Sequence, residues 1–237
     1  TVAILFSFGP IKQDNNYHQF ADTRTIASIP NCLNVISNLP FLLVGYWGFR
    51  LISITGLTPN IAALYKAYRL FFIGVFLIGL GSGYYHYSPD NASLLWDRLP
   101  ITISFMAFFC IVVGECISAQ LAQRLLFPLV LLGIATVIYW CFSELQGHGD
   151  LRPYALVQFL PIILMPLILL LYNGKQKNCH YVWAVLGAYL LAKIAEILDD
   201  AIYRQLVFIS GHSLKHLLAG LGTYFVFADF RKAKANK

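Results

Sequence analysis

Long runs of apolar residues alternate with short polar connectors along this chain. Each run holds roughly 20 residues, enough to cross the hydrocarbon core of a bilayer as a helix. The connectors carry residues that end helices, as in Ser88–Asn91 and Gln146–Asp150. The pattern predicts an all-α, polytopic membrane protein built as a bundle of seven transmembrane helices. The predicted spans cover about 33–54, 68–88, 99–118, 125–142, 154–172, 181–203 and 213–229.

The two ends of the chain differ from this membrane domain. Residues 31–230 form the predicted seven-helix domain, 1–30 an N-terminal segment and loop, and 231–237 a basic tail. The piece from Thr1 to Pro10 is apolar and begins without Met. It is interpreted either as the remnant of an extra N-terminal helix or as part of a signal segment, and the sequence leaves both interpretations open.

Composition supports the membrane assignment. Hydrophobic residues make up 58% of the chain and charged residues only 12%, whereas about a quarter of the residues in soluble domains are charged. The mean hydropathy is +0.66, which also excludes a disordered chain. Five cysteines are scattered without a CxxC pair, so neither a disulfide framework nor a thiolate zinc site is predicted.

The net charge of +6 is interpreted as loop topology rather than as nucleic-acid binding. Basic residues gather in alternate connectors and at the C-terminus, and such residues concentrate on the cytoplasmic side of membrane proteins. We therefore expect a cytoplasmic C-terminus, with the first span beginning outside. The basic positions are Arg50, Lys66, Arg69, Arg124, Lys175, Lys177, Arg231, Lys232, Lys234 and Lys237.

Polar residues at span ends are the candidates for chemistry, because an ionisable group within a bilayer is costly. Ser82 and His86 lie four apart at the end of the second span, and Asp97 stands at the start of the third. His212 and His216 lie four apart at the start of the seventh, which places both on one helix face. Topology brings these five residues to the outer side of the bundle.

Two histidines at this spacing are a recurrent way to bind one tetrahedral zinc ion, and His86 offers a third ligand. Zinc with three protein ligands lowers the pKa of a bound water to near 7. Asp97 could then take the proton of that water, and Ser82 could donate a hydrogen bond to the oxyanion. A structural pair of histidines and a helix N-terminal carboxylate are the simpler interpretations of the same residues.

Together these motifs resemble the alkaline ceramidase family and its wider superfamily of seven-helix membrane hydrolases, which includes the adiponectin receptors and the Per1 proteins. The resemblance rests on three motifs and on the segment Asn34–Leu39, which is similar to the family's first-helix motif, and it extends across nearly the whole chain. The three motifs are Ser82-x-x-x-His86, Asp97 followed by Arg-Leu-Pro, and Ser-Gly-His212-Ser-Leu-Lys-His216. Short bacterial members are the most similar, so a bacterial inner membrane is expected.

The resemblance implies a zinc amidase that cleaves ceramide, or a similar lipid amide drawn from the bilayer, to a sphingoid base and a fatty acid. By that analogy His86, His212 and His216 bind zinc, Asp97 is the base and Ser82 assists. Asp199, in the sixth span, is expected to support a ligand histidine through a hydrogen bond.

Animal members of the family carry an acidic calcium site ahead of the first span, with a carboxylate where Asn31 falls here. This chain offers only Asp14, Asp22 and neighbouring amides there, so the resemblance is not taken to imply a calcium site.

Two other functions compete with the hydrolase. A haem electron carrier would use His86 and one histidine of the seventh span as axial ligands, but it gives Ser82 and Asp97 no role. A non-catalytic seven-helix receptor would hold zinc structurally, and such sites usually close with four protein ligands. The choice between an amide and an ester bond, and the oligomeric state, stay open.

Overall fold

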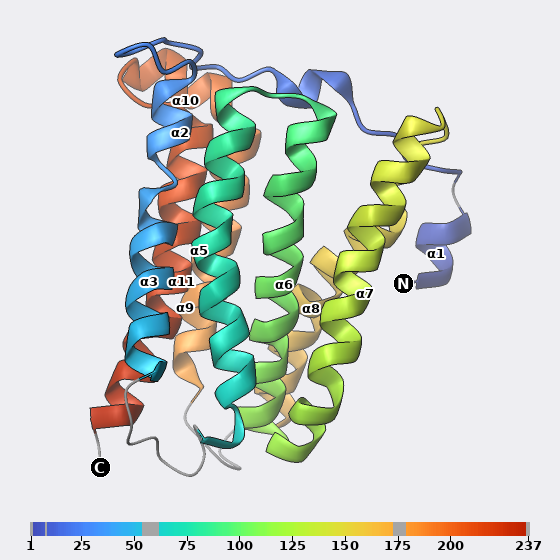
Figure 1. Ribbon diagram of the computed structural model, residues 1–237, viewed down its shortest axis with the longest axis vertical. Helices are drawn as coiled ribbons and strands as arrows, with labels where there is room; N and C mark the ends of the chain where they lie inside the picture. The colour runs from blue at the N-terminus through green and yellow to red at the C-terminus, as the bar shows by residue number, and fades with distance from the viewer. Residues whose placement is uncertain (1, 8, 54–61, 173–178, 236–237) are drawn as a thin grey trace.

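The computed structural model describes residues 2–7, 9–53, 62–172 and 179–235. Long helices run side by side through it (Figure 1), and no strand occurs within these ranges. The long helices are α3 (Leu39–Ser53), α5 (Tyr65–Tyr87), α6 (Asn91–Cys116), α7 (Ala119–Leu145), α8 (Arg152–Leu171), α9 (His180–Ile197) and α11 (Gly211–Ala235). The short ones are α1 (Val2–Ser7), a 3-10 turn (Asn15–His18), α2 (Cys32–Ile36) and α10 (Asp199–Leu206).

The protein is an integral membrane protein. In the described part of the chain, five helical segments are long and apolar enough to cross a bilayer: α2 with α3, then α5, α6, α7 and α8. A sixth is formed if α9 and α10 count as one bent span. The predicted count of seven is not reached by this criterion, because α11 carries polar residues along its first turns. The basic positions Lys175, Lys177 and Lys237, and the span end predicted at residue 54, lie outside the described residues.

The predicted sixth span, 181–203, is not a single straight helix. The chain bends by 78° between α9 and α10, after Leu198. Residues beyond the bend are strongly polar, with two aspartates in the first turn of α10 and Arg204 in its last. A charged, amphipathic turn is more stable along the membrane surface than in hydrocarbon, and α10 lies across one end of the bundle (Figure 1).

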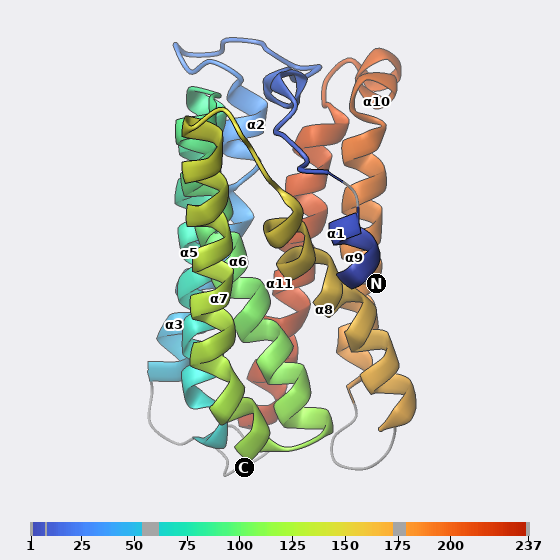
Figure 2. The same ribbon diagram turned by 90° about the vertical axis from the view of Figure 1, so that its right-hand side faces the viewer.

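Helix α6 lies at the centre of the bundle. In the most apolar window of α6, 72% of the residues are buried, against 28% in α8. Helices α5 and α7 flank α6, α3 packs against α5, and α11 packs between α3 and α9. Figure 2 shows α8 and α9 closing the bundle on the side opposite α5. The N-terminal segment 9–31 crosses the same end of the bundle as α10 before the chain enters α2.

Glycine allows α5 and α6 to approach closely beside the candidate site. A Cβ atom on Gly81 would collide with the backbone carbonyl of Trp96, and one on Gly74 would meet the Ser104 side chain. Backbone cannot move aside as a flexible side chain can, so Gly81 fixes the separation of the two helices. This contact sets the distance between Ser82 on α5 and Asp97 on α6.

We expect Gly81→Ala to destabilise the protein by about 1–3 kcal/mol, because the new methyl group overpacks the α5–α6 contact. Thermal unfolding in detergent, followed by circular dichroism, measures the change. Gly83→Ala is the matched control, since a Cβ atom there meets nothing within 4 Å. Equal midpoints for the two variants would contradict this account of the helix contact.

Candidate metal centre

Three histidines meet at the end of the bundle where α10 lies. His86 ends α5, and His212 and His216 lie one turn apart at the start of α11. Their exposed fractions are only 1%, 6% and 4%. One ring nitrogen from each lies within 4.8 Å of the others, and the Nε2 atoms of His86 and His216 are 3.2 Å apart. The three imidazoles therefore converge on one point.

Hydrogen bonds orient the ring of His216. Its Nδ1 atom lies 2.8 Å from the Ser37 hydroxyl and 3.5 Å from the Asn38 amide nitrogen. With Nδ1 occupied on the α2 side, Nε2 faces His86. A hydrogen bond to one imidazole nitrogen is the usual way in which a protein fixes the other as a metal ligand.

The donor set fits a metal ion. His86 Nδ1 and His212 Nε2 are buried and have no hydrogen-bond partner in the described part of the chain. Buried polar atoms are normally paired, so a metal ion would explain the unpaired His212 Nε2; it would not account for His86 Nδ1, because Nε2 of that ring faces His216. Three imidazoles are the ligand set of catalytic zinc sites. Neither Asp97 nor a cysteine joins this group among the described residues.

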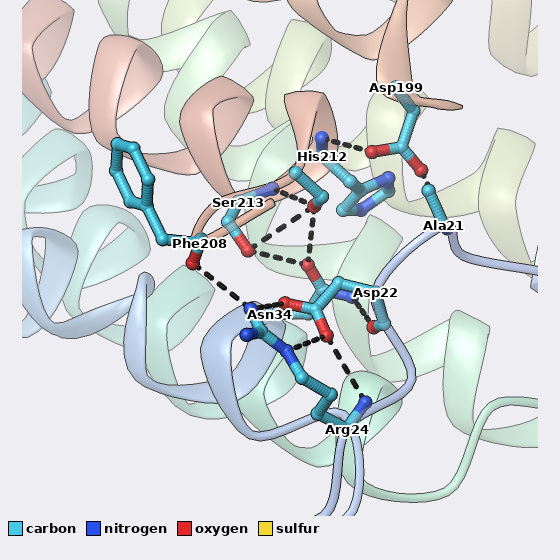
Figure 3. A network of polar contacts seen from close by, with 9 residues as sticks. Ala21, Asp22, Arg24, Asn34, Asp199, Phe208, His212 and Ser213 are labelled. Carbon is cyan, nitrogen blue, oxygen red and sulfur yellow. Dashed lines mark hydrogen bonds and ion pairs between the residues drawn. The ribbon is translucent and has the colours of Figure 1, made fainter. Parts of the chain in front are cut away.

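Polar residues of α2 hold the first turn of α11. Asn34 is fully buried, and its side-chain oxygen accepts a hydrogen bond from the Ser213 hydroxyl at 2.7 Å (Figure 3). Its amide group donates to the carbonyl of Asp22 at 3.1 Å. Ser210, fully buried beside them, accepts from the backbone N–H of Ser213 at 3.1 Å. These bonds replace the water that the first turn of a helix would otherwise bind.

The N-terminal segment covers the three histidines. The ring of Phe20 lies with its centroid 4.7 Å from that of His86 and 4.7 Å from that of His212. The next residue, Ala21, donates its backbone N–H to Asp199 at 3.0 Å, and Asp199 also accepts from the backbone N–H of His212 at 2.7 Å (Figure 3). Asp199 thus hydrogen-bonds a candidate ligand histidine at its backbone N–H.

Asp22 is paired within the same segment. Its carboxylate accepts hydrogen bonds from the Arg24 side chain at 2.8 and 2.7 Å, and Arg24 also donates to the carbonyl of Phe208 at 3.0 Å. The Arg24 guanidinium lowers the pKa of Asp22 below its ordinary value of 3.8. Asn31 donates to the carbonyl of His86 at 2.9 Å. Asp22 and Asn31 are therefore both engaged in contacts within the chain.

Ser82 and Asp97 lie beside the histidines and face the interior. Both line a cavity of about 350 Å³ that also reaches His216. Ser82 is 3% exposed, Asp97 is half-buried, and the Ser82 hydroxyl interacts with the Asp97 carboxylate. Helix α6 begins at Asn91, earlier than the predicted 99, so Asp97 lies within the helix rather than ahead of it.

Sequence reasoning brought together the five residues that converge here but missed Phe20, which nothing in its sequence neighbourhood marks. Ser37 and Asn38 were quoted only as part of the Asn34–Leu39 motif. Their signal was available, because residues 34, 37 and 38 share one helix face in an apolar stretch.

The fold and site define a helical integral membrane protein with a buried three-histidine group open to an internal cavity. The sequence matches the family model described as Ceramidase over residues 18–236, nearly its full length. The chain belongs to the ceramidase family. A comparison with curated proteins gives no significant match.

Asp22→Asn tests how the N-terminal segment is held. The folded-state pKa of Asp22 is depressed, so its pairing with Arg24 stabilises the protein above pH 3.8 and is lost as the pH falls through the folded pKa. We expect the variant to unfold at a lower temperature at pH 7, with the difference from the parent protein shrinking toward pH 3. Thermal scans across this range measure it. A difference that is constant with pH would contradict the ion-pair explanation, and Arg24→Gln should reproduce the variant's behaviour.

Proposed function

We propose that the protein is a zinc-dependent membrane hydrolase that cleaves a ceramide-like lipid amide to a sphingoid base and a fatty acid. The observation that carries this proposal is the convergence of three buried imidazoles, with unpaired nitrogens, beside Ser82 and Asp97 at one end of a largely apolar cavity. Membership of the ceramidase family supports the reaction class. His86, His212 and His216 would hold the ion.

The residues around the ion divide the chemistry among them. Zinc bound by three histidines polarises a carbonyl oxygen and lowers the pKa of a water in its open coordination position. Asp97, on the cavity side, accepts the proton of the attacking water at a carboxylate oxygen and returns it to the nitrogen of the leaving amine. Ser82 positions Asp97 through their hydrogen bond, and once Asp97 holds the proton the Ser82 hydroxyl donates to the oxygen that becomes negative. Phe20 keeps bulk water from the outer face of the histidines.

Two features favour this function over its alternatives. Axial histidines lie on opposite sides of a haem plane, whereas the three ring centroids here are 4.7 to 5.0 Å apart and in mutual contact. A structural zinc site normally has four protein ligands, and the group found among the described residues has three. The adjacent cavity leaves room for a substrate beside the three histidines.

The proposal includes the topology. Helix α11 lies between α3 and α9 and makes the seventh span, with its polar first turn facing the site rather than lipid. The C-terminus is cytoplasmic, the metal centre lies toward the outer, periplasmic side, and the membrane is a bacterial inner membrane. Arg50, Lys66 and Arg69 lie at the same end of the bundle as the basic end of α11, consistent with the positive-inside rule.

His212→Ala should remove most of the bound metal, because two imidazoles hold zinc far more weakly than three. Elemental mass spectrometry of the detergent-purified protein measures the metal: we expect about one zinc per chain in the parent and little in the variant. His148→Ala, an exposed histidine, is the control and should retain the metal. Equal zinc content in His212→Ala and the parent would refute the assigned ligands.

Asp97→Asn separates chemistry from metal binding. We expect zinc to stay bound while the hydrolysis rate of ceramide falls by about 10²–10⁴-fold, as is typical for loss of a general base. Asp200→Asn changes a carboxylate that pairs with Arg204 on the surface and should leave turnover intact. If Asp97→Asn turned over at the parent rate, another group would have to serve as the base.

A further inference from the structure

The cavity beside the metal centre has two chemically different ends. Along α6 its lining runs from Asp97 to Phe108, and along α11 from Lys215 to Val226. Eleven residues of helix span about 16 Å, so the cavity extends far into the bundle. Its inner part is lined by aromatic and aliphatic side chains, and charged side chains gather at the outer end beside His216. A lipid would place its acyl chain inward and its polar group outward.

Two lysines share one carboxylate at the outer end. Lys193 Nζ lies 2.7 Å from Glu196 Oε2, and Lys215 Nζ lies 3.0 Å from Glu196 Oε1. All three side chains line the cavity. Lys193 is 33% exposed, Lys215 18% and Glu196 17%. One carboxylate neutralises only one ammonium group, so this cluster keeps a positive charge.

Arg98 adds another cation to the same end. It is 6% exposed, and its guanidinium carbon lies 4.1 Å from the ring centroid of Trp140 and 4.9 Å from that of Tyr154. Its Nη2 atom donates to the side-chain oxygen of Gln13, whereas Nη1 is buried without a hydrogen-bond partner in the described part of the chain. Within the same part of the chain, no carboxylate forms an ion pair with Arg98.

The charged groups of the cavity therefore do not balance. Among the residues that line the cavity, Lys193, Lys215 and Arg98 carry three positive charges and Glu196 and Asp97 carry two negative ones, so one positive charge has no counterpart within the lining. Burying a charge without a partner is costly. A ligand that carries an anionic oxygen would supply the missing partner, whereas a neutral hydroxyl would leave it absent.

We propose that the substrate is an N-acyl lipid that carries an anionic oxygen group, such as a phosphate, sulfonate or carboxylate, close to its amide, and that Lys193 and Lys215 select it. This inference rests on the proposed hydrolase function. Lys215 and His216 both line the cavity, so a group bound by the Lys215 ammonium lies in the same cavity as the amide that the metal centre cleaves. Arg98 adds to the positive potential at the same end.

The test compares ceramide with ceramide 1-phosphate of identical chains, on the purified full-length protein in detergent. We expect kcat/KM to be about ten-fold or more higher for the phosphorylated lipid, and Lys193→Gln and Lys215→Gln to lower that ratio by about ten-fold each. N-dodecanoyl taurine and N-dodecanoyl glycine are each compared with the neutral N-dodecanoyl ethanolamine. The three ratios of kcat/KM, anionic over neutral, show whether a phosphate, a sulfonate or a carboxylate is preferred.

Two further variants show whether charge is the cause. Lys215→Arg keeps the charge and should keep the preference for the anionic lipid. Lys66→Gln is the matched control, because Lys66 is exposed at the opposite end of the bundle and should not change the ratio. A parent protein that prefers neutral ceramide, or a ratio that is the same in Lys215→Gln and the parent, would overturn the proposal.

Binding of non-hydrolysable urea analogues of ceramide, with and without the 1-phosphate, separates this proposal from the hydrolase function. Tighter binding of the phosphorylated analogue without hydrolysis of any amide would support the anion site and refute the proposed reaction. Hydrolysis of neutral ceramide, with equal binding of both analogues, would support the proposed reaction and refute the anion site.

Discussion

The burial of three imidazoles at the end of an apolar bundle is the constraint on which this structure depends. Polar groups removed from water need partners, and the surrounding elements supply them. Ser37, which directly follows α2, bonds the ring of His216, and Asp199 accepts from the backbone N–H of His212. Asn34 holds Ser213 between them. The first turn of α11 is thereby fixed before any metal is considered.

The site is built from long helices and from the irregular N-terminal segment. Helices α5, α6 and α11 carry the histidines, Ser82 and Asp97, and glycine at position 81 sets how closely α5 and α6 approach. The N-terminal segment contributes Phe20, which covers two of the rings. Its attachment uses Asp22, Arg24 and backbone groups, so the cover is held by polar bonds.

The cavity connects the three-histidine group with the space that a lipid substrate would occupy. Its depth along α6 and α11 suits an acyl chain, and its polar end lies beside His216. Family membership indicates amide hydrolysis in general terms, whereas Lys193, Lys215 and Arg98 supply the positive charges of the cavity lining. Charge in the cavity, rather than the metal ligands, is therefore where its substrate preference is to be sought.

The sequence by itself determined the membrane class, most helix positions and the candidate ligands, because hydropathy runs and the i, i+4 spacing of His212 and His216 are local properties. Only the tertiary structure decided what depends on distant segments meeting. The bend after Leu198, the contact of Phe20 with the histidines and the sharing of Glu196 by two lysines all follow from packing and long-range electrostatics. The Lys193–Glu196 pair is a local helix spacing, whereas the contacts of Phe20 with the histidines and of Lys215 with Glu196 join residues whose spacing along the chain is arbitrary.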